Sequence, residues 1–106
     1  MDLIQRMEAE LVEEFKQLIS DEPGKNFVKP ASDFWKDSKP EEVPVYGTYG
    51  IWFDAEGGTL MKDGQWPCEY YNGIIHQDIK DFLEKYKGTI YLTWYDPATV
   101  LILIKK

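Results

Sequence analysis

Residues 89–104 read TIYLTWYDPATVLILI, in which two apolar runs flank a turn-forming segment at 96–99. This pattern predicts a β-hairpin, and the hairpin decides the fold because both of its strands are apolar at almost every position. A half-solvated antiparallel sheet alternates apolar with polar residues, whereas continuous apolar runs are typical of strands covered on both faces. If Tyr95 lies opposite Val100, one face holds Ile90, Leu92, Trp94, Leu101 and Leu103, and the other holds Tyr91, Thr93, Tyr95, Val100, Ile102 and Ile104. We therefore expect the second face to be covered by another part of the chain, by a second copy or by a different molecule.

The composition is that of a folded, acidic protein. The chain has 106 residues, of which 43% are hydrophobic and 15% aromatic, values that fit one domain and exclude a disordered chain. The net charge of −7 arises from 19 acidic residues against 12 basic ones. This excess of acid disfavours nucleic acid and anionic membranes as ligands, because both are bound through Lys and Arg. It permits a partner protein with a basic surface.

The cysteine content and the first residues of the chain indicate the cellular compartment. Cys68 is the single cysteine, which rules out an internal disulfide and fits a reducing environment. The chain starts with an amphipathic pattern instead of a charged-then-apolar signal segment, and it contains no apolar run near 18 residues. We expect a soluble, cytoplasmic protein.

The first half of the chain predicts a helix and a long connector. Apolar residues recur at three- and four-residue steps over residues 2–20, which indicates an amphipathic helix. Residues 21–44 then contain four prolines, and a connection of this length often carries a function or hidden structure. We expect this connector to wrap the fold and to lay Phe27, Phe34 and Trp35 over it.

The second half of the chain alternates between strand and helix patterns. From Val45 the period changes to two, with Val45, Tyr49, Ile51 and Phe53 on one side of a strand and Tyr46, Thr48 and Trp52 on the other. A short strand over 59–62, the turn Asp63-Gly64 and a return through 65–66 follow. Residues 74–87 predict a second helix, which Gly88 ends in a left-handed conformation. The order of helix, two or three strands, helix and two strands predicts a single α+β domain over residues 1–106. Its sheet is mostly antiparallel with four to five strands, and two helices pack on one face.

The residues that could carry chemistry are few. Cys68 and His76 are the only thiol and the only imidazole, and a catalytic thiolate would need a base or a cation close to it. We expect a buried, inert cysteine and a surface histidine. Asp54, Glu56 and Asp63 bracket one turn but lack the ligand spacing of a calcium loop. We therefore predict no catalytic residue, no metal site and no cofactor.

The sheet face away from the helices is the predicted binding surface. Tyrosine and tryptophan are enriched at protein interfaces, and acidic groups near the strand ends would form a rim suited to a basic partner. The predicted partner-binding residues are Tyr46, Trp52, Tyr91, Tyr95, Asp54, Glu56 and Asp96. The competing interpretation is that Phe27, Phe34 and Trp35 cover this face within the molecule.

These observations lead to three functional hypotheses. The first is a small acidic interaction module, of inhibitor or immunity type, that blocks a basic surface of a partner protein. The second is a self-associating structural protein, in which paired sheet faces or edges complete a homodimer. The third is a small enzyme or ligand-binding domain that uses Cys68, His76 and the segment 66–71.

Overall fold

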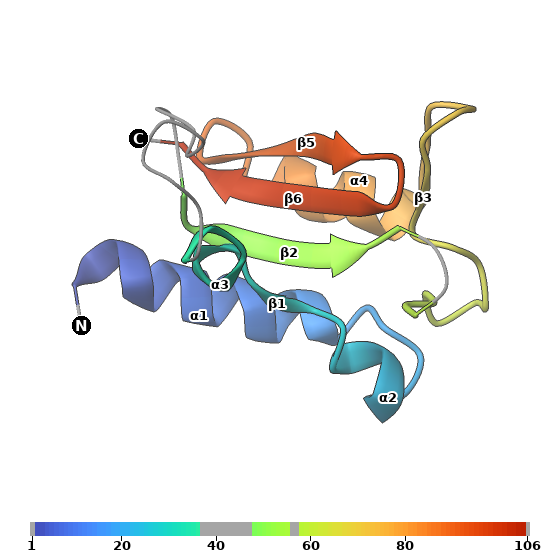
Figure 1. Ribbon diagram of the computed structural model, residues 1–106, viewed down its shortest axis with the longest axis horizontal. Helices are drawn as coiled ribbons and strands as arrows, with labels where there is room; N and C mark the ends of the chain where they lie inside the picture. The colour runs from blue at the N-terminus through green and yellow to red at the C-terminus, as the bar shows by residue number, and fades with distance from the viewer. Residues whose placement is uncertain (1, 37–47, 56–57, 106) are drawn as a thin grey trace.

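The computed structural model describes residues 2–36, 48–55 and 58–105. Its elements, in chain order, are α1 (Leu3–Lys16), α2 (Glu22–Lys25), β1 (Lys29–Pro30), α3 (Ala31–Trp35), β2 (Gly50–Asp54), β3 (Cys68–Glu69), β4 (Ile74–Ile75), α4 (Gln77–Lys85), β5 (Ile90–Asp96) and β6 (Thr99–Ile104). Four strands form an antiparallel sheet in the order β1-β2-β6-β5 (Figure 1). β3 pairs with β4 in a separate hairpin. The predicted α+β class, with two longer helices packed on an antiparallel sheet, is confirmed.

The closing hairpin has a register that differs by one residue from the predicted one. Trp94, and not Tyr95, lies opposite Val100, and Tyr95 forms an irregularity between Trp94 and Asp96. Asp96 pairs directly with Thr99, so the loop holds only two residues and the extra residue is accommodated as a bulge. A one-residue shift exchanges the faces of one strand relative to the other. One face therefore holds Ile90, Leu92, Trp94, Val100, Ile102 and Ile104, and the other holds Tyr91, Thr93, Leu101 and Leu103.

The main core lies between the first of these faces and the two longer helices. Phe15 of α1 packs against Phe53 of β2, with ring centroids 4.8 Å apart, and against Phe82 of α4 at 5.5 Å. The buried apolar residues of this core are Leu11, Val12, Phe15, Ile19, Val28, Ile51, Phe53, Ala55, Met61, Cys68, Ile79, Phe82, Ile90, Val100, Ile102 and Ile104. Ile102 and Ile104 thus belong to the helix-covered face, where the predicted register did not place them.

The second face of the sheet is covered by α3, which belongs to the predicted connector. Trp35 and Ala31 form a smaller buried cluster with Leu101 and Leu103 of β6. Phe34 packs edge-on against Trp52 of β2, with centroids 5.1 Å apart. The described part of the connector therefore hides the surplus apolar surface of the closing hairpin within the molecule. Of the three aromatic residues expected to do this, Phe34 and Trp35 do, whereas the Phe27 side chain stays 45% exposed.

A buried glutamate fastens α3 to the rest of the fold. Glu8 of α1 is 6% exposed, and its carboxylate accepts hydrogen bonds from the Ser32 amide at 3.1 Å, the Ser32 hydroxyl at 2.6 Å and the Gly50 amide at 3.0 Å. Gly50 has a φ of +148°, and a Cβ there would overlap the carbonyl oxygen of Ile102. One carboxylate thus joins α1, α3 and the start of β2.

Both longer helices are shorter than the sequence patterns predicted. α1 begins after Asp2, whose side chain accepts from the Gln5 amide in a capping box, and it ends at Lys16 instead of residue 20. α4 begins at Gln77 instead of residue 74, because Ile74 and Ile75 pair with β3. The apolar side chains of Ile74 and Ile75 fit a helical period as well as a strand, so periodicity alone did not distinguish helix from strand here.

Residues 59–62 and 65–66 do not form the predicted pair of β-strands. The turn between them does form: the Gly64 amide donates to the Met61 carbonyl at 2.9 Å, and Gly64 has a φ of +82°. Gly88 has a φ of +89°, which confirms the left-handed ending predicted after the second helix. Val45, the other residues of 37–47, and Glu56 lie outside the described residues. No helix among the described residues is long and apolar enough to cross a membrane.

Candidate functional site

The aromatic residues of the predicted binding face are mostly covered. Trp52 and Tyr91 are half-buried against the α3 cluster, and the Lys29 ammonium lies 5.3 Å from the centre of the Trp52 ring. Tyr95 is 59% exposed, although the Phe34 ring packs against it at 4.7 Å. Tyr46 lies outside the described residues. Tyr95 is therefore the one large open side chain among the described members of this predicted site.

The described acidic members of the predicted rim lie together at one end of the sheet. Asp54 of β2 and Asp96 of β5 both pair with Thr99 of the strand between them. Partial burial raises the pKa of Asp54, Lys29 partly offsets that effect, and the Asp96 carboxylate raises the pKa further. Glu56, the third predicted acidic residue, lies outside the described residues.

A different surface holds half of the large exposed apolar side chains in the described part of the chain. Eight large hydrophobic residues in the described part of the chain are exposed, and four of them belong to the nine residues 66–74. These four are Trp66, Tyr70, Tyr71 and Ile74, which together with Glu69 we call the hairpin surface. The Tyr70 ring packs against Tyr71 at 5.3 Å and against Trp94 of β5 at 5.2 Å. The hairpin surface is thus anchored to the main sheet through Tyr70.

The β3–β4 pairing explains why these side chains point outward. Cys68 pairs with Ile75, and both contribute to the main core. Successive residues of a strand point to opposite sides, so the neighbouring pair of Glu69 and Ile74 faces away from the core. Gly73, with a φ of +63°, closes the turn between the two strands.

A groove borders the hairpin surface. It has a volume of about 540 Å³ and is lined by Gly64, Gln65, Trp66, Glu69, Ile74 and His76. A smaller hollow of about 230 Å³ has Tyr70, Tyr71 and Asn72 among its lining residues. Trp66 and Glu69 line both depressions.

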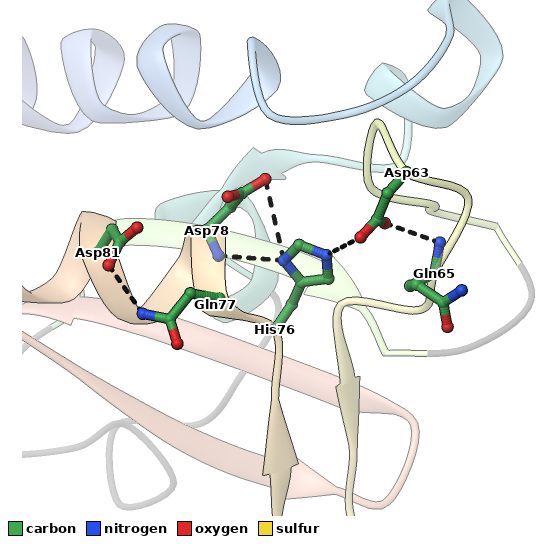
Figure 2. A network of polar contacts seen from close by, with 6 residues as sticks. All are labelled: Asp63, Gln65, His76, Gln77, Asp78 and Asp81. Atoms are coloured by element: carbon green, nitrogen blue, oxygen red, sulfur yellow. Dashed lines mark hydrogen bonds and ion pairs between the residues drawn. The ribbon is translucent and has the colours of Figure 1, made fainter.

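His76 joins the groove to the start of α4 through a network of polar contacts, which Figure 2 shows. Its Nδ1 accepts a hydrogen bond from the Asp78 amide at 3.0 Å, and its Nε2 lies 2.8 Å from a carboxylate oxygen of Asp63. Because an amide N–H can only donate, Nδ1 is unprotonated, and the ring proton on Nε2 is donated to Asp63. The Gln65 amide and then His76 lower the pKa of Asp63, which keeps its carboxylate ionised.

This network leaves Cys68 without a catalytic base. Both ring nitrogens of His76 are already engaged, one by the Asp78 amide and the other by Asp63. Cys68 is buried, and burial raises the pKa of its thiol to about 12. A thiol with that pKa stays protonated at neutral pH, so this geometry does not provide a nucleophile.

Neither a metal site in the described part of the chain nor a similarity to known proteins points to a function. No three His, Cys, Asp or Glu side chains converge on a possible metal site among the described residues. No protein-family model, curated protein or solved structure matches this chain.

The sequence predicts part of this surface, but in a different structure. The third hypothesis uses the segment 66–71 with Cys68 and His76 for ligand binding, and the helical pattern over 74–87 places Ile74 in a helix. The dipeptide Asn72-Gly73 is a frequent turn signal, and apolar residues flank it on both sides. This pattern could have indicated a second hairpin.

Proposed function

We propose that this chain is a protein-binding module that recognises a partner with a basic surface through its hairpin surface. The observation that carries the proposal is the clustering of Trp66, Tyr70, Tyr71 and Ile74 as exposed side chains on one hairpin. Contiguous exposed apolar groups are costly in water and often mark interaction sites. Trp and Tyr are also the residues that most often dominate binding energy at interfaces.

Charge supports the choice of a basic partner. Glu69 lies within the hairpin surface, Asp63 borders the groove through His76, and the chain as a whole carries a net charge of −7. Complementary charge speeds association and suppresses unsuitable partners, while apolar burial slows dissociation. In an inhibitor or immunity-type role, such a protein would cover a basic site on its partner and keep other ligands away from it.

The experiment compares capture of partners by matched variants at increasing salt. The wild type, Trp66→Ala/Tyr71→Ala, Tyr95→Ala and the control Leu3→Ala would be immobilised and exposed to extracts of the native host. We expect one partner to be retained by the wild type, Leu3→Ala and Tyr95→Ala, to be lost with Trp66→Ala/Tyr71→Ala, and to elute as salt rises. Loss with Tyr95→Ala alone would move the site to the sheet end near Asp54 and Asp96. Equal retention by all four variants, or none by the wild type, would contradict the proposal.

A second candidate function is self-association through the edge of β5. This strand has seven residues and, among the described strands, pairs only with β6. Its residues include no Lys and no Pro, two of the devices that protect sheet edges from pairing. The opposite edge, β1, has two residues, Lys29 and Pro30, and is protected in both ways. A second copy could therefore extend the sheet at β5 but not at β1.

Light scattering over a dilution series tests this second candidate. If β5 edges pair, the wild type should change from dimer to monomer on dilution, and Thr93→Lys should remain monomeric throughout. Circular dichroism would verify that Thr93→Lys keeps the fold. A wild type that stays monomeric up to the highest concentration would contradict self-association.

A further inference from the structure

We propose that the groove beside the hairpin is a subsite for one arginine side chain of the partner, which stacks on Trp66 and pairs with Glu69. This inference rests on the proposed function and specifies the chemistry of the recognised residue. The groove lies between the side chains of Trp66, Glu69, Ile74 and His76. Three properties of these residues lead to arginine: apolar walls, an uncompensated carboxylate and a histidine whose two ring nitrogens are both engaged.

The walls suit a long side chain with a flat cationic end. Trp66 is 48% exposed and Ile74 is 51% exposed, so each presents about half of its surface to the groove and the solvent around it. A tryptophan ring attracts a cation over its face, and more often that of an arginine than of a lysine. The methylene groups of an arginine can cover Ile74 while the guanidinium reaches the polar end of the groove.

The charge in the groove is negative and unpaired within the described part of the chain. Glu69 is half-buried, and no ion pair joins it to a described Lys or Arg. None of the residues that line the groove is a lysine or an arginine. A guanidinium can satisfy a carboxylate with two parallel hydrogen bonds, which a lysine ammonium cannot do in the same plane.

The polar network around His76, which lines the groove, engages both ring nitrogens and so leaves His76 no free donor for Glu69. His76 receives the Asp78 amide on Nδ1, and its Nε2 contacts Asp63, so both ring nitrogens are engaged and the ring is held in place (Figure 2). Asp63 remains ionised next to it and adds to the negative potential.

The test titrates the labelled protein with a capped hexa-arginine peptide and follows the indole N–H of Trp66 by NMR. Hexa-lysine and hexa-citrulline serve as matched peptides, the first with charge alone and the second with shape alone. We expect hexa-arginine to shift the signals of Trp66, Ile74 and His76 and to bind at least about fivefold more tightly than hexa-lysine. Hexa-citrulline should leave the three signals unchanged.

Two charge-matched variants separate the groove from the general acidity of the protein. Glu69→Gln should weaken hexa-arginine binding by about tenfold, whereas Glu10→Gln, on the exposed side of α1, should change it by less than about twofold. Equal effects of the two variants, or equal binding of the arginine and lysine peptides, would overturn the arginine subsite. So would groove shifts with maltohexaose or chitohexaose that hexa-arginine does not produce.

These outcomes are distinguishable from failure of the proposed function. If Trp66→Ala/Tyr71→Ala loses the captured partner but Glu69→Gln retains it, the hairpin surface binds a protein without an arginine in the groove. If neither variant affects capture, the proposed function itself fails.

Discussion

Single side chains hold the parts of this small protein together, and Glu8 is the clearest case. Glu8 lies on the buried side of α1 with Leu11, Val12 and Phe15, and its carboxylate accepts three hydrogen bonds from Ser32 and Gly50. The sequence contains a signal for this contact, because a charged residue at a core-facing helix position is almost never buried without partners. The partners themselves lie 24 and 42 residues away, and no local pattern identifies them.

The Glu8→Ala variant should lose about 2–4 kcal/mol of unfolding free energy, because the Ser32 and Gly50 amides would stay buried without acceptors. Urea denaturation measures the loss. The control Glu10→Ala removes an exposed glutamate from the same helix and should change stability by less than about 0.5 kcal/mol. A Glu8→Ala effect as small as that of the control would contradict the role of Glu8 as the fastening between α1, α3 and β2.

The Cys68 thiol should react very slowly with thiol reagents in the folded protein. Burial raises its pKa from the usual 9.0 to about 12, which lowers the thiolate fraction about a thousandfold at pH 8. The measurement compares the modification rate in buffer with that in denaturant. A folded-state rate within tenfold of the unfolded one would show that the thiol is accessible and ionisable.

Asp54 predicts a pH dependence of stability with a definite sign. Burial, and then the Asp96 carboxylate, raise its pKa in the folded state above the ordinary 3.8, so folding favours the protonated form. The stabilising effect of that proton is complete below pH 3.8 and is lost as the pH rises through the folded-state pKa. Asp54→Asn should therefore stabilise the protein at pH 7, by about 0.3–1 kcal/mol after allowance for solvent screening. Thermal unfolding at pH 7 and pH 3 measures this, and an equal change at both values would contradict it.

At the level of elements, the sequence predicted the secondary structure of a segment better than the segments with which it pairs. The closing hairpin was predicted from its apolar runs, but its register depended on whether the loop held two residues or four. The bulge at Tyr95 is set by the Asp96–Thr99 pairing, in which the Asp96 side chain also accepts from the Ala98 amide at 2.9 Å. The aromatic connector was expected to lie over the fold, yet only the structure shows that α3 covers Leu101 and Leu103.

Trp35→Ala should open the second face of the sheet. Trp35 packs on Leu101 and Leu103, so we expect a loss of about 3–5 kcal/mol and new binding of a hydrophobic dye such as ANS. Phe27→Ala is the matched control, since Phe27 belongs to the same connector but is half exposed. If the two variants have the same stability and bind no dye, α3 does not act as a cover.

At the scale of the whole molecule, the two apolar surfaces differ in whether the chain itself covers them. The second sheet face is mostly closed by α3, and the hairpin surface is open. The acidic composition could be read from the sequence and still motivates a basic partner. The location of the site could not, because Ile74 fits a helix or a strand equally well and only tertiary pairing with Glu69 decides between them.

Hydroxyl-radical footprinting of the free protein, read by mass spectrometry, tests this division of surfaces most directly. We expect fast oxidation of Trp66 and Tyr71 and slow oxidation of Trp35 and Trp52, because Trp35 is buried between α3 and the sheet and the α3 cluster packs against Trp52. The contradicting result is the reverse order: Trp35 and Trp52 modified as fast as a free indole while residues 66–74 are protected.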